Sequence, residues 1–147
     1  MAKIDYWAIE QELAEIIRSS LDGYTVEVEP EMMFAAEQTP WVSIYLLRRD
    51  APEGQPIAAN KRLRLHLQFS IYVWCWHLEK REALRLRNAA LGELELVLLR
   101  NPTVNDMVNF IFLEGGELQS VRVEGTLGGF ASGGEILLTA EAVAIVT

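Results

Sequence analysis

Between Lys61 and Trp76, apolar and polar residues alternate without a break. Because successive side chains of a β-strand point to opposite faces, this pattern predicts one strand with a buried face and a polar face. At ~3.3 Å per residue the strand approaches ~50 Å, well beyond the usual length of about five or six residues. We therefore expect its charged end to project past the core as one arm of a hairpin, with Tyr45 to Asp50 as the other arm. The apolar positions are Leu63, Leu65, Leu67, Phe69, Ile71, Val73 and Cys75.

Two segments have the spacing of apolar residues that is typical of amphipathic helices. The first runs from Asp5 to Leu21, with Asp5 as the expected N-cap and Asp22-Gly23 as the stop. The second runs from Glu79 to Arg100 and is stopped by Asn101-Pro102. Both helices are expected to pack on the sheet through their apolar stripes.

The remaining elements are predicted from β-branched and aromatic residues, from alternation and from glycine and proline. Strands are expected at Tyr24 to Glu29 and Trp41 to Arg49, followed by a loop from Asp50 to Asn60. The C-terminal part is expected to hold a hairpin of Val108 to Leu113 and Glu117 to Glu124 around Gly115-Gly116, a glycine-rich loop from Gly125 to Gly134, and a last strand from Glu135 to Thr147.

This order of elements predicts an α+β domain with two helices on one face of a largely antiparallel or mixed sheet and a projecting β-hairpin arm. The 147 residues fit one domain at ~100 to 200 residues per domain, and half of them are hydrophobic. We therefore expect residues 1–147 to share one core.

The composition excludes several classes of function. Lys and Arg number 13 against 21 Asp and Glu, and a formal charge of −8 opposes a sequence-independent grip on phosphate backbones. The single cysteine, Cys75, cannot form an internal disulfide, which fits a reducing compartment. The N-terminus lacks the pattern of a secretory signal, and no apolar run approaches the ~20 residues of a membrane span. We expect a soluble intracellular protein without a membrane partner.

Three patterns that often carry chemistry are incomplete. Gly128 and Gly133 have the spacing of a phosphate-binding loop, but Gly134 and Glu135 stand where that loop needs Lys and Ser or Thr. Cys75 and His77 could share a strand face, whereas His66 has the opposite parity and cannot complete a three-ligand metal site. Neither histidine has a partner at a catalytic spacing. We expect no catalytic residue, no cofactor and no metal.

Trp74 and Trp76 fall on the polar face of the long strand. Base stacking normally needs a basic groove, which the overall charge does not favour. Packing in the core or between subunits is the expected role of these tryptophans.

The charges are unevenly distributed along the chain. Residues 1–47 hold two basic and nine acidic side chains, residues 48–100 hold ten and six, and residues 101–147 hold one and six. A subunit with patches of opposite sign suits head-to-tail contacts with its own copies, which can close into a ring. Charges scattered only for solubility are the alternative. The candidate interface residues are those of the arm: Arg48, Arg49, Asp50, Glu53, Lys61, Arg62 and Arg64.

The layout resembles the tail terminator proteins of long-tailed bacteriophages, also called tail completion or tail-to-head joining proteins. Such proteins are small subunits that form a hexameric ring on the head-proximal end of the tail tube, stop its polymerisation and present a surface to the neck. The matching features are the helix from Asp5 to Leu21, the strands Trp41 to Arg49 and Arg62 to Trp76 around a polar loop, the helix from Glu79 to Leu99 and the closing strands to Thr147.

The resemblance implies a structural virion protein with no chemistry of its own, present in the host cytoplasm during assembly. Its partners would be its own copies, the tail tube protein and a neck protein, and the loop from Arg48 to Arg64 would contact the tube or a neighbouring subunit. An acidic ring would let DNA pass through its lumen without holding it. Two alternatives remain open: a neck connector or head-completion subunit, and a small ligand-binding or enzymatic domain with a pocket between the second helix and the sheet.

Overall fold

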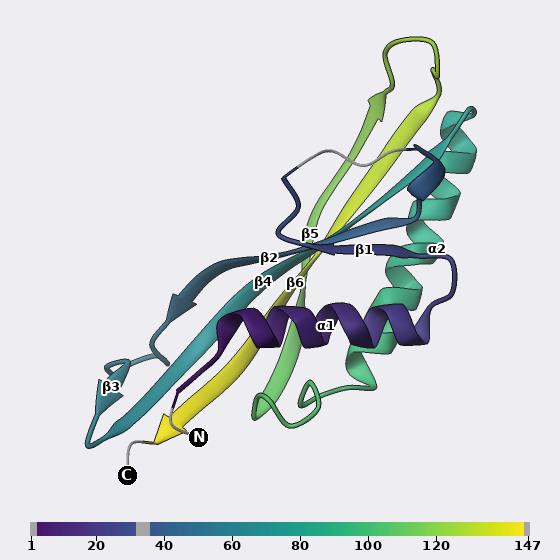
Figure 1. Cartoon of the computed structure of the whole chain (residues 1–147). Helices are drawn as coiled ribbons and strands as arrows, with labels where there is room; N and C mark the ends of the chain where they lie inside the picture. Colours follow the sequence, from purple (N-terminus) through teal and green to yellow (C-terminus); the bar gives the residue numbers. More distant parts are fainter. Residues whose placement is uncertain (1–2, 32–35, 146–147) are drawn as a thin grey trace.

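A computed structural model describes residues 3–31 and 36–145 (Figure 1). It has two helices, α1 (Tyr6–Ser20) and α2 (Lys80–Leu99), and a short 3-10 turn, η1 (Ala36–Gln38). With its six-stranded mixed sheet, this confirms the predicted α+β fold. The strands are β1 (Thr25–Val28), β2 (Trp41–Asp50), β3 (Ala58–Ala59), β4 (Arg62–His77), β5 (Phe110–Arg122) and β6 (Phe130–Ile145).

The sheet is built around two long strands that pair along their whole length. β4 and β6 run antiparallel from the pair Arg62 and Ile145 to the pair His77 and Phe130. The strand order is β1-β2-β4-β6-β5, with β3 paired to the beginning of β4. Among the strands that the structure describes, only β1 and β2 pair in parallel. Figure 1 shows the result: an elongated, twisted sheet with β3 at one end and the β5–β6 connection at the other.

The alternation of β4 separates the two faces of the sheet as predicted. Its odd-numbered side chains from Leu65 to Cys75 are buried in one core with the apolar stripes of both helices. Burying an aliphatic side chain of this kind contributes about 1.5 to 3 kcal/mol, so this stripe is a main source of stability. The even-numbered side chains of β4 point to the other face, called here the uncovered face because neither helix lies on it.

The first helix begins where the sequence predicts. Asp5 has an extended backbone, and its Oδ1 accepts a hydrogen bond from the amide of Ala8 at 3.0 Å. This satisfies one of the amide groups that the first turn of a helix leaves unpaired. Asp5 is therefore confirmed as the N-cap of α1.

The predicted hairpin at Gly115-Gly116 is wrong. β5 continues through both glycines, with a register shift between Gly115 and Leu118. A Cβ added at Gly116 would lie 2.7 Å from the Cβ of Glu135. Gly116 is therefore needed for the close approach of two strands at a bulge and not for a turn.

The predicted glycine-rich loop is also too long. β6 begins at Phe130, so only residues 123–129 connect it to β5. A Cβ on Gly133 would meet the ring of Tyr72 at 2.5 Å, and one on Gly134 would meet Leu91 at 2.7 Å. Gly133 and Gly134 are therefore strand residues. Side chains of β4 and α2 pack directly against their Cα atoms and leave no room for a Cβ. Residues 146–147 of the predicted last strand lie outside the described residues.

The hairpin of β2 and β4 is present, but the first residues of β4 pair with other strands than predicted. β2 ends with Asp50 opposite His66, so Arg62 and Arg64 pair instead with β3 and β6. β3 lies inside the segment predicted as a loop. Asn60 and Lys61 connect it to β4 with φ of 53° and 60°, as a two-residue hairpin turn with two left-handed residues requires.

Candidate interaction surface

The arm, defined here as residues 48–64, brings most of the predicted interface residues to the uncovered face. A bulge at Leu47 places Arg48 opposite Gln68 on this face, and Asp50 follows opposite His66. Arg62 and Arg64 reach the same face from β4. Four of the seven residues predicted for an interface thus share one face of the sheet.

Arg49 is directed to the opposite face. Its Nη1 donates a hydrogen bond to the hydroxyl of Tyr6 at 3.0 Å, and its guanidinium carbon lies 5.7 Å from the centre of the Tyr6 ring. Arg49 therefore attaches the arm to α1, and it is separated from the other arginines. Nothing in the sequence around Arg49 shows this, because the bulge at Leu47 decides which face each residue takes.

Arg48 and Asp50 neutralise each other in part. Arg48 Nε lies 2.6 Å from Asp50 Oδ2, and both side chains are at least half exposed. An exposed pair of this kind contributes at most about 1 kcal/mol. The two side chains help to line an open hollow of about 290 Å³ together with Ala51, His66, Gln68 and Thr139.

Arg64 is held by a buried acid. Its Nη2 lies 3.1 Å from Oε2 of Glu141 on β6, and His66 Nε2 lies 3.4 Å from the same oxygen. Asn109 donates to the other carboxylate oxygen at 3.0 Å. Burial alone would raise the pKa of Glu141, but the hydrogen bonds from Asn109 and Arg64, with the charge of Arg64, lower it overall. Glu141 therefore stays ionised and fixes Arg64.

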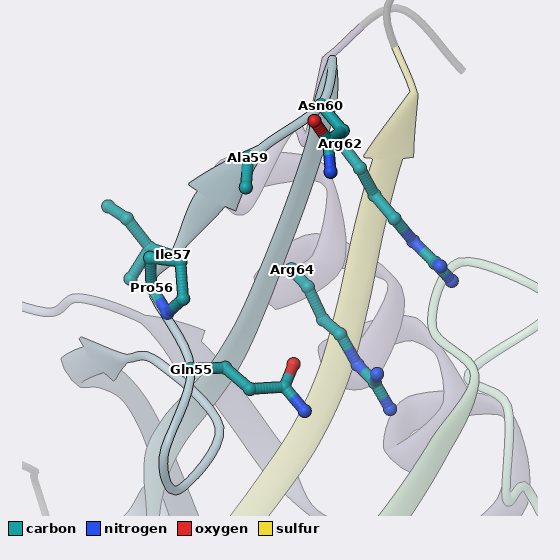
Figure 2. A pocket seen from close by; sticks show the side chains of 7 residues that line it. All are labelled: Gln55, Pro56, Ile57, Ala59, Asn60, Arg62 and Arg64. Carbon is teal, nitrogen blue, oxygen red and sulfur yellow. The ribbon is translucent and has the colours of Figure 1, made fainter.

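The tip of the arm keeps its charges available. Lys61, Arg62 and Glu53 are exposed, and none of them forms an ion pair within residues 3–31 and 36–145. Figure 2 shows the side chains of Arg62 and Arg64 extending across β6, with the loop of Gln55 to Ile57 on the other side of β4. The hollow at this place has a volume of about 410 Å³ and is lined by Gln55, Pro56, Ile57, Ala59, Asn60, Arg62 and Arg64.

The sequence reasoning missed the aromatic side chains beside the arm. Phe110 and Phe112 on β5 are exposed on the uncovered face, their rings stack 6.3 Å apart, and both meet the His66 ring edge-on. The signal was present, since residues 110–113 are apolar on both strand faces although only one face is covered. The uncovered face thus has more exposed apolar surface than a solvated sheet face needs.

A second apolar region lies at the far end of the same face. Trp74 and Trp76 line a hollow of about 250 Å³, and Trp76 Nε1 donates to the carbonyl of Gly128 at 2.9 Å. The position of both tryptophans on the face opposite the core is as predicted. The other lining residues of this tryptophan hollow are Ala36, Val121, Val123, Leu127 and Ala131.

A hollow between α2 and the sheet is also present, where the sequence analysis placed the pocket of a ligand-binding alternative. It has a volume of about 290 Å³ and opens beside the bulge of β5, between Leu91 and Leu118. Glu95, Glu114 and Glu135 line it together with apolar residues. No cluster of three metal-ligating side chains occurs in the described part of the chain.

Comparison with protein-family models and with curated proteins found no match to this chain. Neither helix of the described residues is long and apolar enough to cross a membrane. The described surface offers three features that bear on function: a basic arm, a sheet face without a helix that exposes Phe110 and Phe112, and a tryptophan hollow at the far end.

Proposed function

We propose that this chain is a structural subunit that forms a ring with its own copies, of the tail terminator type. In this role the ring sits on the head-proximal end of a phage tail tube, ends tube polymerisation and joins the tail to the neck. The observation that carries the proposal is the arm tip, where Lys61 and Arg62 are exposed without an ion-pair partner in the described chain. Cationic groups placed at the end of a long sheet suit contact with an acidic neighbour.

The turn at the arm tip supports an interaction role for Lys61. Its φ of 60° is left-handed, a conformation that costs a residue with a Cβ about 1 to 2 kcal/mol and costs glycine almost nothing. Asn-Gly is the favoured pair in such turns. A lysine at this position is locally unfavourable, and such local conflicts concentrate at functional sites.

The uncovered face supplies the apolar part of an interface. Its exposed large side chains lie along the whole length of the sheet, from Ile145 beside the arm to Val121 beside the tryptophan hollow. Interfaces combine an apolar centre with a polar rim. An excess of eight negative charges per subunit would give the ring an acidic lumen that repels DNA phosphates.

The proposal is tested first by the mass of the native protein. We expect a closed ring, with six copies as the expected number, that dissociates as salt is raised because the contacts include ion pairs. Arg62→Glu should weaken the ring, whereas Arg100→Glu should not, since Arg100 is exposed at the end of α2 on the helical side. A chain that remains monomeric at low salt and at high concentration would contradict the proposal.

The position of the ring in the phage particle is tested by adding the purified ring to purified tail tubes and imaging the mixture by electron microscopy. We expect rings at one end of the tube and an arrest of further polymerisation. Rings that bind portal-bearing heads and leave the tubes free would instead identify a neck connector or head-completion subunit.

A further inference from the structure

We propose that the arm of one copy docks in the tryptophan hollow of the next copy, with Ile57 as the inserted side chain. This inference rests on the proposed ring and names the two surfaces that form it. The occupant of the hollow is thus a second copy of this chain.

The two surfaces lie at opposite ends of one strand and on one face. Arg62 begins β4 and Trp76 stands one residue before its end, and both are even-numbered residues of the uncovered face. At ~3.3 Å per residue they are separated by roughly 45 Å along a continuous strand, so a copy cannot place its own arm in its own hollow. A contact between different surfaces of identical copies is head-to-tail, and it closes into a ring when the rotation allows.

The apolar groups of the two surfaces are complementary. Ile57 is 40% exposed beside Pro56, just before the two exposed alanines of β3. The hollow is lined almost entirely by aliphatic and indole groups, and Leu127 at its edge is 50% exposed. Insertion of Ile57 would remove apolar surface from water on both copies, which is the usual driving force of association.

The charges at the rims are also complementary. Glu37 follows the lining residue Ala36, and Glu124 follows the lining residue Val123; both glutamates are exposed, as is Arg122 between Val121 and Val123, so acidic groups outnumber basic ones beside the hollow by two to one. On the arm, Lys61 lies in the turn that follows β3, and Arg62 comes directly after it. Docking would therefore bring two basic groups to two acidic groups, an arrangement that speeds encounter and sets orientation.

The test is disulfide cross-linking between two single variants, Ile57→Cys and Leu127→Cys, mixed at low salt under mild oxidation. We expect a covalent dimer on the order of tenfold more abundant than in a control mixture of Ile57→Cys with Leu96→Cys, because a disulfide needs the two Cα atoms within about 7 Å. Leu96 is as exposed as Leu127 but lies on α2. Cys75 is buried and does not compete.

A chain that carries both Ile57→Cys and Leu127→Cys should close into a covalent ring, and Ile57→Asp should abolish ring formation while leaving the folded monomer. A wild-type ring with no excess of the Ile57–Leu127 cross-link over the control overturns this inference and leaves the proposed function standing. Absence of a wild-type ring overturns both.

Discussion

Arg64 on β4 and Glu141 on β6 are joined by an ion pair of 3.1 Å on the uncovered face of the sheet. The glutamate side chain is almost fully buried, and Asn109 and His66 complete its contacts. The residues are 77 positions apart in the sequence, so the pair links the arm to the C-terminal strand. It also explains why Arg62, and not Arg64, is the arginine to change when assembly is tested.

Glu141→Gln is expected to lower the free energy of unfolding by about 1 to 2 kcal/mol at pH 7, because charged hydrogen bonds are replaced by neutral ones. The pKa of Glu141 is lowered by folding, so its stabilising effect is present above about pH 4.5 and is lost as the pH falls through the folded pKa. Urea unfolding of wild type and variant at pH 7 and pH 3 measures the stability difference at each pH. A difference between wild type and variant that persists undiminished at pH 3 would contradict it.

Glu10 is expected to make the protein less stable as the pH rises, whereas Glu141 makes it more stable. Burial in α1 and, second, the negative charge of Glu29 raise its pKa from 4.5 to about 7, and the amide of Leu46 offsets this only in part. Oε2 of Glu10 and Oε2 of Glu29 are both buried without a hydrogen-bond partner in the described chain. The folded protein therefore keeps a proton that the unfolded chain releases, and stability should fall as the pH rises from about 4.5 to about 7.

Glu10→Gln should remove this loss, because a neutral amide cannot ionise. We expect the variant to gain roughly 1 to 3 kcal/mol over wild type at pH 8 and much less at pH 4. Thermal unfolding at the two pH values is the measurement, with exposed Glu15→Gln in the same helix as control. An equal effect of Glu10→Gln at both pH values would show that the carboxyl does not titrate in this range.

Cys75 should be inert while the protein is folded. The side chain is buried in the core, and burial raises the pKa of the thiol to about 11. Since the thiolate is the reactive form, a disulfide reagent at pH 8 should modify native protein very slowly and unfolded protein at once. Rapid modification in the absence of denaturant would contradict the burial of this residue.

The sequence predicts the long strand and the helices well because their signals are local. The alternation through Phe69 and the N-cap at Asp5 need only the order of neighbouring residues. The bulges at Leu47 and Gly115 could not be predicted, since they depend on which strand lies alongside. Each bulge moves the following residues to the other face, and without the one at Leu47 the uncovered face would carry Arg49 in place of Arg48.

The predictions at Gly115-Gly116 and at Gly125 to Gly134 were wrong for a related reason. A glycine that permits a turn and one that permits close packing look alike in a sequence. Gly128 has a left-handed φ of 69° and lies in a loop, whereas Gly133 lies in β6 under two aromatic rings. The charged residues of the candidate site are visible in the sequence. The apolar run of residues 110–113 is visible too, but the position of Phe110 beside His66 depends on the pairing of β5 with β6.

Gly133→Ala is expected to destabilise the protein by about 1 to 3 kcal/mol, because the new methyl group meets ring atoms of Tyr72 and Trp74 at 2.5 to 2.9 Å. Gly92→Ala is the control, and we expect it to raise the stability of the protein instead of lowering it. Gly92 lies within α2 with open space around it, so alanine should stabilise the helix by about 0.5 to 1 kcal/mol. Chemical denaturation of the two variants measures both changes. A neutral Gly133→Ala would mean that the rings do not lie over β6.

Lys61→Gly is expected to stabilise the single chain and to weaken its assembly. Glycine adopts the left-handed conformation of this turn without the clash of a Cβ, so the monomer should gain about 0.5 to 1 kcal/mol. The same change removes a positive charge from the arm tip, and the ring should dissociate at a lower salt concentration. Lys61→Ala separates the two effects, since it removes the charge but keeps the Cβ. It should weaken the ring equally and give no gain in the thermal unfolding of the monomer at high salt. If Lys61→Gly instead stabilises monomer and ring alike, the charge of Lys61 takes no part in assembly, and its place in a strained turn has no functional reason.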